Sequence, residues 1–554
     1  MPPTRRRSID VCVIRDLQCP DDPPAAIEAI RRARPAAELA WLDAQDHLGR
    51  PAGASLLAFD PLAVLEQPAA PDGRPGGPAL LRIGGRIVDT DPDGWQLWRR
   101  AHDRLPRCAA LDGLGPGWIG FVGFGAAELL EPRMAAGSRS AQRACPADGL
   151  GLPLMRLALF DRVIVFDAST RRARLLAADG PCERLGLTPR PFEPDAEQWN
   201  AACAAPPLPL RGPRRITVSA GHDAGEHERM VRRALDYISA GDVYQVNLSR
   251  RLRLSGVGCP WETYVRVRRA NPAPYGALLT WAESPAAGAS LVDRVPPERV
   301  RAVASVSPEL FLQVRGAEVL TRPIKGTRPR HLDPALDRGE LSDLLGSAKD
   351  AAELAMIVDL HRNDLGRVCR PGSVEVTNAR RVEAHARVFH TLADVRGRLA
   401  SGADALAALA ACFPAGSISG VPKIRACQVI RELEPAPRGV FTGAIGALGL
   451  DGGLTMSVAI RTLQIADGTA DLHVGGGIVA ESDPRAEFEE TRAKARGILE
   501  ALHAEPDANG GRERARVAIP RQGPAHPLPH GRGSDHGRGS DRGRGSDHGR
   551  GSDQ

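Results

Sequence analysis

Residues 157–168 read Leu-Ala-Leu-Phe-Asp-Arg-Val-Ile-Val-Phe-Asp-Ala, and residues 170–176 read Thr-Arg-Arg-Ala-Arg-Leu-Leu. β-Branched, aromatic and aliphatic side chains fill the first run, and an Ala-Ser-Thr turn separates it from the second. Strands joined by so short a turn pair in antiparallel fashion. Residues 117–125, Gly-Trp-Ile-Gly-Phe-Val-Gly-Phe-Gly, predict another strand. These segments indicate a fold with much antiparallel sheet.

The rest of the chain adds helices and divides into four regions. Residues 1–200 read as short strands among loops, a Pro-rich and charged stretch predicts a linker at 201–223, and strands mix with helices over 224–504. The first of these helices is expected at about residues 224–240. Without a regular βαβ rhythm or a Gly-x-Gly-x-x-Gly motif, a dinucleotide fold is unsupported, and we expect the α+β class. Residues 505–554 end in four copies of [His/Arg]-Gly-Arg-Gly-Ser-Asp, a composition typical of a disordered tail.

The composition is ordinary for a globular protein. The 554 residues are 42% hydrophobic and 25% charged, and a net charge of +6 does not require a nucleic-acid partner. No apolar run approaches the roughly 18 residues needed to cross a bilayer, and the basic N-terminus lacks the apolar segment of a secretory signal. The 10 cysteines form no Cys-x-x-Cys pair. We therefore expect reduced thiols in a cytoplasmic protein that does not contact a membrane.

Lysine is almost absent from this chain. The 73 basic residues include only four lysines, Lys325, Lys349, Lys423 and Lys494, which indicates a strong compositional preference for arginine. Arginine keeps its proton under all ordinary conditions, whereas a buried lysine can become a neutral amine nucleophile. Each remaining lysine is therefore a candidate for a chemical role, although chance survival is an equal alternative at any single position.

Two predicted helices carry acidic residues near their N-termini. Ser347 and Asp350 form a capping-box pattern before Glu353, and Asp483-Pro484 opens a second helix that carries Glu487, Glu490 and Lys494 on one face. Carboxylates from two helices suit a hard cation such as Mg²⁺, with water and substrate oxygens as the remaining ligands. Solvated acidic faces, which the helix dipole favours, are the simpler alternative.

Two segments are rich in glycine and small residues. Val474-Gly-Gly-Gly-Ile-Val interrupts an apolar strand, which indicates close approach of another group, either an anion at bare N–H groups or tightly packed backbone. Phe413-Pro-Ala-Gly-Ser-Ile-Ser-Gly-Val-Pro-Lys423 precedes a helix and is a candidate anion site. It lacks the spacing of a Walker loop.

Lys325 lies in the segment Thr321-Arg-Pro-Ile-Lys-Gly-Thr-Arg328. We expect the strand to end at Pro323, which places the lysine at the mouth of a site between Arg322 and Arg328. Neighbouring cations and burial would both lower the pKa of the amine and leave a nucleophilic fraction at neutral pH. A surface lysine in a basic loop is the alternative.

Several of these segments together resemble the chorismate-utilising enzymes. The resemblance spans roughly residues 225–500 and rests on motifs in the same order along the chain: Gly241-Asp-Val-Tyr-Gln-Val-Asn-Leu-Ser, Ser307-Pro-Glu-Leu-Phe, Pro323-Ile-Lys-Gly-Thr-Arg, Glu353-Leu-Ala-Met-Ile-Val-Asp-Leu-His-Arg-Asn-Asp-Leu-Gly, the Phe413 segment and Gly475-Gly-Gly-Ile-Val-Ala-Glu-Ser-Asp-Pro. Residues 1–200 resemble the N-terminal region of anthranilate synthase component I more weakly. The resemblance implies large antiparallel sheets packed as a sandwich with surrounding helices, and a chorismate-binding catalytic domain at 224–504.

The resemblance also implies roles for individual residues. Glu353 and Glu490 match Mg²⁺ ligands, Lys325 matches a nucleophile, and Glu309 matches a general acid that protonates the departing hydroxyl of chorismate. Gln245 stands where isochorismate- and salicylate-forming relatives use a lysine to activate water, which argues against those products. The positions that match substrate-binding residues are Gln245, His390, Ser417, Arg461, Gly475, Gly477 and Lys494.

Within this family, Pro-Ile-Lys-Gly-Thr is the pattern of aminodeoxychorismate synthase component I, whereas anthranilate synthases carry Ala where Lys325 stands. The implied reaction joins chorismate and ammonia to give 4-amino-4-deoxychorismate, a precursor of 4-aminobenzoate for folate. A separate glutamine amidotransferase subunit would supply the ammonia, since no Gly-x-Cys-x-Gly nucleophile motif occurs here. Two departures from the family pattern are Phe441, where many relatives have Tyr, and Trp41-Leu-Asp-Ala44, a poor match to the tryptophan-binding segment of feedback-inhibited relatives.

Two alternatives remain from the sequence. The first is anthranilate synthase component I, which the product formed from chorismate distinguishes. The second, from a different class, is an RNA-binding protein that acts through the Arg-Gly-rich tail, which predicts salt-sensitive RNA affinity that is lost on truncation near residue 505.

Overall fold

The structure is a computed structural model, and it describes most of the chain between residues 13 and 506. The stretches inside these limits that lie outside the described residues are 35–37, 46–52, 109–110, 112–113, 136–148, 168, 190, 192, 207–209, 211–214, 222, 283–299 and 385–387. All described residues belong to one compact unit that spans residues 1–510. The repeat tail, with the RNA-binding alternative that depends on it, lies outside the described residues.

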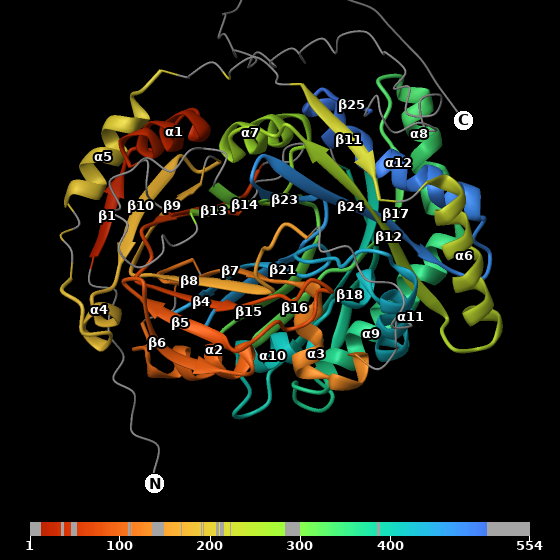
Figure 1. Cartoon of the computed structure of the whole chain (residues 1–554), viewed down its shortest axis with the longest axis horizontal. Helices are drawn as coiled ribbons and strands as arrows, with labels where there is room; N and C mark the ends of the chain where they lie inside the picture. Colours follow the sequence, from red (N-terminus) through yellow and green to blue (C-terminus); the bar gives the residue numbers. More distant parts are fainter. Residues whose placement is uncertain are drawn as a thin grey trace, which may run out of the picture. The chain divides into compact units, whose positions relative to one another are not determined.

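The first of two large sheets combines strands from both ends of the described chain (Figure 1). Its neighbouring strands pair in antiparallel fashion, except for the parallel pair β11 and β25. Its order is β1 (Val13–Leu17), β10 (Arg172–Ala177), β9 (Arg162–Asp167), β3 (Ser55–Phe59), β2 (Leu39–Asp43), β13 (Tyr275–Ala282), β14 (Val300–Ser307), β23 (Thr462–Ala466), β24 (Thr469–Ile478), β12 (Gln245–Ser255), β11 (Ile216–Ala220) and β25 (Ala504–Pro506), with β20 (Gly420–Val421) beside β12.

The second sheet is antiparallel throughout its described pairs and also mixes early and late segments. Its order is β17 (Ile324–Pro329), β19 (Val388–Arg398), β16 (Glu318–Thr321), β15 (Leu310–Arg315), β22 (Leu454–Val458), β21 (Ala444–Gly449), β7 (Gly117–Val122), β8 (Met155–Phe160), β4 (Ala63–Gln67), β5 (Ala79–Ile83) and β6 (Arg86–Asp91), with β18 (Glu375–Ala384) beside β19.

The two sheets pack face to face and helices cover their outer faces, as predicted. A core that includes Leu56 and Leu279 from the first sheet and Phe121 and Ile445 from the second fills the space between them. A second core joins the first sheet to α1 (Pro23–Ala33), α5 (Glu193–Cys203), α7 (Pro260–Ala270) and α12 (Pro484–Ala501). A third core joins the second sheet to α2 (Gly94–Arg104), α9 (Ala348–Gly366) and α10 (Ala405–Cys412). Figure 1 shows these helices on opposite sides of the paired sheets.

The remaining helices lie at the edges of this sandwich. α6 (Ala224–Ser239), α11 (Lys423–Leu433) and β12 share a small core of their own, and α8 (Pro334–Gly346) contacts β17 through buried Leu344. The short helices are α3 (Ala127–Leu130) and α4 (Gly180–Arg184), with 3₁₀ turns at Phe124–Ala126, Pro132–Ala135 and Gly416–Ile418. Among the described helices, none has both the length and the apolar character that a membrane crossing requires.

The predicted hairpin is confirmed in its second half and corrected in its first. β9 and β10 pair as a hairpin, with Asp167 opposite Arg172. Residues 157–167, however, form two strands in different sheets, because the chain turns at buried Asp161 from β8 into β9. The single apolar run therefore supplies one strand to each of the two sheets.

Residues 201–223, predicted as a linker, do not connect two separately folded parts of the chain. β2 pairs with β13 in the first sheet and β7 pairs with β21 in the second, so the regions 1–200 and 224–504 are joined within both sheets. The segment predicted as a linker itself contributes β11, where Ile216 is buried. Its few apolar residues were sufficient to pair with an existing sheet edge.

Candidate active site

Lys325 lies on a strand rather than in the expected loop. β16 ends at Thr321, and after Pro323 the chain forms β17, which pairs with β19 so that Lys325 lies opposite Thr391. The hydroxyl of Thr391 donates to the Lys325 carbonyl. The lysine backbone is therefore fixed at the edge of the second sheet, and only the side chain is free to reach a substrate.

The amine of Lys325 is buried beside a carboxylate. Its Nζ lies 3.9 Å from Oε2 of Glu353, and the lysine side chain is 12% exposed. Burial lowers the pKa of Lys325, the charge of Lys494 lowers it further, and the Glu353 carboxylate opposes both effects. A fraction of neutral amine is therefore favoured at this position.

The cations that lower the pKa differ from those predicted. Arg322 forms an ion pair with Asp394, and Arg328 forms ion pairs with Asp343 and Asp350. Both guanidinium groups are thus bound to acids of their own. The prediction that they flank the amine is wrong, because successive side chains of β17 and the preceding turn project to different sides.

Glu353 lies in the second turn of α9. Ser347 caps this helix by accepting from the N–H of Asp350 at 3.1 Å, as predicted, whereas the Asp350 carboxylate binds Arg328 instead of completing a capping box. Lys349 lies 3.9 Å from the second Glu353 oxygen but is half exposed. The cap thus fixes the start of the helix, and with it the carboxylate opposite Lys325.

α12 brings two further glutamates toward the site. Asp483 caps the helix and Pro484 begins it, as predicted. Glu490 lies 2.6 Å from Lys494, whose charge with that of Lys325 lowers the pKa of this carboxyl against the effect of burial. Glu487 accepts from the Ser482 hydroxyl at 2.7 Å with one oxygen, while its other oxygen is buried without a hydrogen-bond partner among the described residues.

The three consecutive glycines of β24 each face a different neighbour. A Cβ at Gly475 would lie 2.2 Å from the Leu248 carbonyl of β12, so tight backbone packing accounts for this glycine. Its own carbonyl accepts from Lys494 at 2.8 Å. A Cβ at Gly476 would lie 2.9 Å from the unpartnered Glu487 oxygen and 3.5 Å from Glu490.

Gly477 lies below the amine of Lys325. A Cβ there would lie 3.2 Å from Lys325 Nζ and 2.9 Å from the side-chain nitrogen of Gln245. Asn247 would lie 3.3 Å from the same point. Both amide atoms of Gln245 and the Asn247 nitrogen are buried without hydrogen-bond partners among the described residues. Buried amides are rarely left unsatisfied, so these atoms have hydrogen-bonding capacity that a polar ligand could satisfy.

Glu309 and Ser417 of the predicted set share a short hydrogen bond. The Ser417 hydroxyl donates to Oε1 of Glu309 at 2.6 Å, and both side chains are buried. Burial raises the pKa of Glu309 to about 7, although the Ser417 hydrogen bond and the charge of Lys325 both act to lower it. A carboxyl with this pKa can donate a proton at neutral pH, as a general acid must.

His390 and Arg461 lie near these groups through the backbone. His390 is buried on β19, and its Nδ1 lies 3.0 Å from the Thr327 hydroxyl of β17. The Arg461 carbonyl accepts from the N–H of Val306, the residue directly before the Ser307-Pro-Glu309 segment. Burial lowers the pKa of Arg461, and none of the described acidic residues forms an ion pair with it. Arg461 is half-buried, and a partly desolvated cation without an ion pair to the described acids is suited to an anionic ligand.

The structure therefore brings most of the predicted residues together. Direct distances or shared neighbours link Lys325 with Glu353, Glu490, Lys494, Gln245, Gly477, Glu309 and Ser417. Two further residues have unsatisfied atoms in this region: Asn247 was not predicted, and Glu487 was noted only as an acid on the same helix face as Glu490. Their signals were present: Asn247 lies two residues after Gln245 on one strand, and Glu487 lies one helical turn before Glu490.

These residues fit a hard divalent cation that also binds substrate. The described part of the chain has no group of three or more acidic, histidine or cysteine side chains arranged to hold a metal by themselves. The donors that gather here are glutamate oxygens, one of them buried and unpartnered at Glu487. Mg²⁺ commonly takes one or two carboxylates and completes its octahedron with water and substrate oxygens.

Comparison with known proteins shows the family of this chain. The family model for chorismate binding enzyme matches residues 85–500. Anthranilate synthase component 1 of Streptomyces coelicolor is 38% identical over 76% of this chain and 80% of its own length. Aminodeoxychorismate synthase component 1 of Klebsiella aerogenes is 38% identical over 64% of this chain and 72% of its own length. The crystal structure of anthranilate synthase component I from Streptococcus pneumoniae superposes with a TM-score of 0.64 and 28% identity, covering 82% of this chain and 94% of that one.

Proposed function

The chain belongs to the family of chorismate-binding enzymes, and from this premise we propose that it converts chorismate and ammonia to 4-amino-4-deoxychorismate with Lys325 as a covalent nucleophile. The observation that carries the choice of product is the position of Lys325. Its amine is buried at the point where Glu309, Glu353, Gln245 and Gly477 meet. A buried amine whose ion pair is as long as 3.9 Å costs stability, which favours a role in the reaction over a structural role.

The proposed first step is displacement of the chorismate 4-hydroxyl. Neutral Lys325 forms a C–N bond at C2, both ring double bonds shift by one position, and the hydroxyl leaves C4 as water with the proton of Glu309. Hydroxide is a poor leaving group, so a protonated acid at this oxygen supplies much of the acceleration. The raised pKa of Glu309, about 7, supports this role.

Ammonia then replaces the lysine. It forms a C–N bond at C4, both ring double bonds return to their first positions, and the bond from C2 to Lys325 breaks. Lys325 leaves as the neutral amine, and the proton that the new ammonium loses returns to Glu309, so the enzyme regains its starting state. Gln245 lies beside Lys325 through their shared neighbour Gly477 and cannot act as a base, which favours ammonia over an activated water as the entering group.

Binding of the dianionic substrate is assigned to the basic groups and to Mg²⁺. When bound between Glu353 and Glu490, Mg²⁺ would hold the conjugated carboxylate and draw electron density from the ring. Arg461 and the N–H groups of the β24 glycines would bind carboxylate oxygens. Lys494 would exchange part of its contact with Glu490 for the substrate.

The ammonia source is a further part of the proposal. The relatives are named as component 1 of their synthases, which indicates a second component. We assign the supply of ammonia to a separate glutamine amidotransferase, and the enzyme to folate synthesis in the cytoplasm. The chain alone should then use ammonium salts and fail to use glutamine.

Anthranilate synthesis is the second candidate, because the relatives that cover most of this chain are anthranilate synthases. The test incubates the purified chain with chorismate, Mg²⁺ and ammonium chloride, and identifies products by mass spectrometry and fluorescence. Formation of 4-amino-4-deoxychorismate, absent without ammonium, supports the proposal. Fluorescent anthranilate as the main product without a second enzyme contradicts it and leaves the rival reaction.

A further inference from the structure

Lys423 joins the two ends of the segment 413–422, which carries Ser417. Its ammonium donates to Oδ2 of Asp364 at 2.7 Å and to the carbonyl of Cys412 at 2.8 Å. Cys412 is the last residue of α10 and Lys423 is the first of α11. One ammonium therefore joins both ends of residues 413–422 to each other and, through Asp364, to α9.

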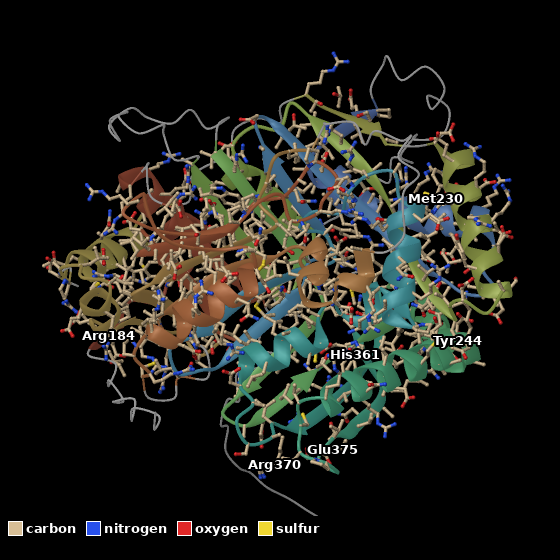
Figure 2. The ribbon with its side chains drawn as sticks, turned by 60° about the horizontal axis from the view of Figure 1, so that its bottom comes forward. Arg184, Met230, Tyr244, His361, Arg370 and Glu375 are labelled. Carbon is tan, nitrogen blue, oxygen red and sulfur yellow. The ribbon has the colours of Figure 1, made fainter. Side chains whose placement is uncertain are left out.

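The middle of this segment packs closely on the same helix. A Cβ at Gly416 would lie 2.5 Å from Cδ2 of Leu360 and 3.3 Å from the ring of His361. His361 in turn lies 2.7 Å from the Thr321 hydroxyl of β16, and burial lowers its pKa to about 3, so the ring is neutral. Figure 2 labels His361 on α9, and its side chain is buried. The helix thus offers a rigid, uncharged surface to the segment.

The opposite side of the segment is held by the strand that carries Gln245. The N–H of Asn247 donates to the Ser419 carbonyl at 2.9 Å, and Arg438 donates to the Ile418 carbonyl at 3.1 Å. Ser417 lies between these supports, with its hydroxyl on Glu309. Its position is thus fixed by α9 on one side and β12 on the other.

We propose that the Asp364–Lys423 ion pair is a positioning device that holds residues 413–422 so that Ser417 stays hydrogen-bonded to Glu309. The inference rests on the proposed function for the role of Glu309, and on the hydrogen bonds of Lys423 and Ser417 for the rest. Lys423 itself does not touch Glu309, so it acts through Ser417. The Lys423 side chain is 11% exposed and that of Asp364 is 9% exposed, which shields the pair from screening by solvent.

This arrangement also explains why a lysine occupies the position in an arginine-rich chain. An ammonium is a compact donor that can serve a carboxylate and a carbonyl at one point, whereas a guanidinium is wide and planar. The earlier interpretation of Lys423 as part of an anion site is not needed, since both of its contacts are within the protein.

The test compares Lys423→Met with Ser417→Ala as a benchmark and Arg268→Met as a control for lost stability. Arg268 forms a buried ion pair with Asp43 in a different core, so its loss destabilises the fold away from the site. For each variant, kcat/KM for chorismate is measured against pH, together with Tm. Hydrogen exchange of residues 413–422 provides a readout that does not require activity.

The expected result follows from the Ser417 hydrogen bond. That bond favours the charged form of Glu309, so its loss raises the pKa of the acid and moves the alkaline limb of kcat/KM to higher pH. Lys325 is the charged group that faces Glu309, and it is retained in every variant. Lys423→Met should lose roughly 10- to 100-fold in kcat/KM through misplacement of the acid, shift the limb as Ser417→Ala does, and exchange faster at 413–422. Arg268→Met should do none of these.

The proposal is overturned if Lys423→Met loses Tm as Arg268→Met does but keeps the wild-type pH profile. If Lys423→Met does not fold, Asp364→Asn, which keeps the bond from Lys423 to Cys412, is judged by the same two outcomes. The proposed function fails separately, if the wild-type chain does not consume chorismate or Ser417→Ala is indistinguishable from it. Faster exchange at 413–422 in Lys423→Met would then still show that the ion pair holds the segment.

Discussion

Two buried groups of charged residues, one around Asp43 and one around Lys325, differ in how completely they are paired. The Asp43 carboxylate accepts from the Tyr264 hydroxyl at 2.9 Å and from Arg268 at 2.5 and 3.1 Å. The Tyr264 ring packs edge-on against Trp41, and the Arg268 guanidinium lies over the Trp41 ring. Asp43, Tyr264 and Arg268 thus pair with one another, and we call these three residues the Asp43 cluster. The ring nitrogen of the neighbouring Trp41 is buried without a hydrogen-bond partner among the described residues.

The Lys325 site is incomplete by the same measure. Its ion pair with Glu353 is long, at 3.9 Å, and the amides of Gln245 and one oxygen of Glu487 have no hydrogen-bond partners among the described residues. Each such buried atom costs stability, about 1–3 kcal/mol, unless a ligand satisfies it. The contrast teaches that a fully paired cluster stabilises the fold, whereas an underpaired one retains capacity for substrate.

The largest expected effect on activity comes from a substitution in the Lys325 site, where buried polar atoms lack partners in the described part of the chain. Lys325→Ala should lower the rate of amination by about 10³-fold or more, since removal of a covalent nucleophile leaves only binding and electrostatic assistance. Its free energy of unfolding should stay equal or rise, because a desolvated amine is removed. Chorismate consumption and chemical denaturation measure the two quantities.

Lys349→Ala is the matched control, because Lys349 also lies 3.9 Å from Glu353 but is half exposed. It should lose less than about tenfold in rate, since an exposed ion pair contributes little. Intact mass of wild type with chorismate and no ammonia should show an adduct equal to chorismate less one water. A Lys325→Ala variant within tenfold of wild type would rule out the covalent route.

The second prediction concerns the stability that the Asp43 cluster provides. Asp43→Ala leaves Arg268 buried without its counter-ion, so the free energy of unfolding should drop by about 3–5 kcal/mol. The kcat/KM of the folded protein should remain within about twofold, because the Asp43 cluster lies in the core between the first sheet and its helices. Urea denaturation and active-site-normalised kinetics are the measurements. A large loss of kcat/KM with little loss of stability would reverse the comparison.

Glu309 gives the third prediction, through pH. Its pKa of about 7 in the folded protein lies above the ordinary 4.5, so kcat/KM should fall as the pH rises through about 7 and the acid loses its proton. Glu309→Gln should lose about 10²-fold in kcat/KM and flatten this limb.

The same shift has a consequence for stability. A carboxyl with a raised pKa favours the folded state at low pH, and this contribution is lost as the pH rises through about 7. Glu309→Gln should therefore raise Tm more at pH 8 than at pH 6. An equal change in Tm at both values would indicate that Glu309 titrates near its ordinary pKa.

Much of the fold was predictable from local patterns. The helix at 224–240 and the caps at Ser347 and Asp483 follow from periodicity and from side chains that satisfy the first N–H groups. The crossing of the chain between sheets at Asp161 was not predictable, because a continuous apolar run does not reveal which layer each half faces. Pairing of β2 with β13, more than 200 residues apart, likewise depends on tertiary contacts.

The candidate site was predictable to a different degree. Rarity of lysine identified a set of residues that the structure explains together: Lys325 and Lys349 contact Glu353, Lys494 contacts Glu490, and Lys423 contacts Asp364. The sequence could not show the direction in which each side chain projects. Arg322 and Arg328 were therefore wrongly predicted to lie beside the amine of Lys325. Their acids, Asp394, Asp343 and Asp350, lie at separations of 15 to 72 residues.

Substitution of Glu487 is expected to have the smallest effect on activity. It tests most directly whether an unpartnered buried atom indicates a ligand-binding site. Burial and the neighbouring Glu490 charge raise its pKa, and one oxygen is unpartnered above Gly476. If this oxygen supports the Mg²⁺ site, Glu487→Gln should raise the Mg²⁺ concentration needed for half-maximal activity by roughly 10-fold, as loss of a supporting carboxylate does. The rate at saturating Mg²⁺ should change little, because Glu353 and Glu490 remain.

The control for this prediction is Glu489→Gln, which lies on the same helix but forms an exposed pair with Arg492. It should leave the Mg²⁺ dependence unchanged. If Glu487→Gln also leaves it unchanged while raising Tm, then the unpartnered oxygen is only a desolvated charge whose removal relieves repulsion with Glu490. Unsatisfied polar atoms would then indicate ligand binding at Lys325 and Gln245 but not on α12. The contrast with the Asp43 cluster would hold only for the part of the site around the Lys325 amine.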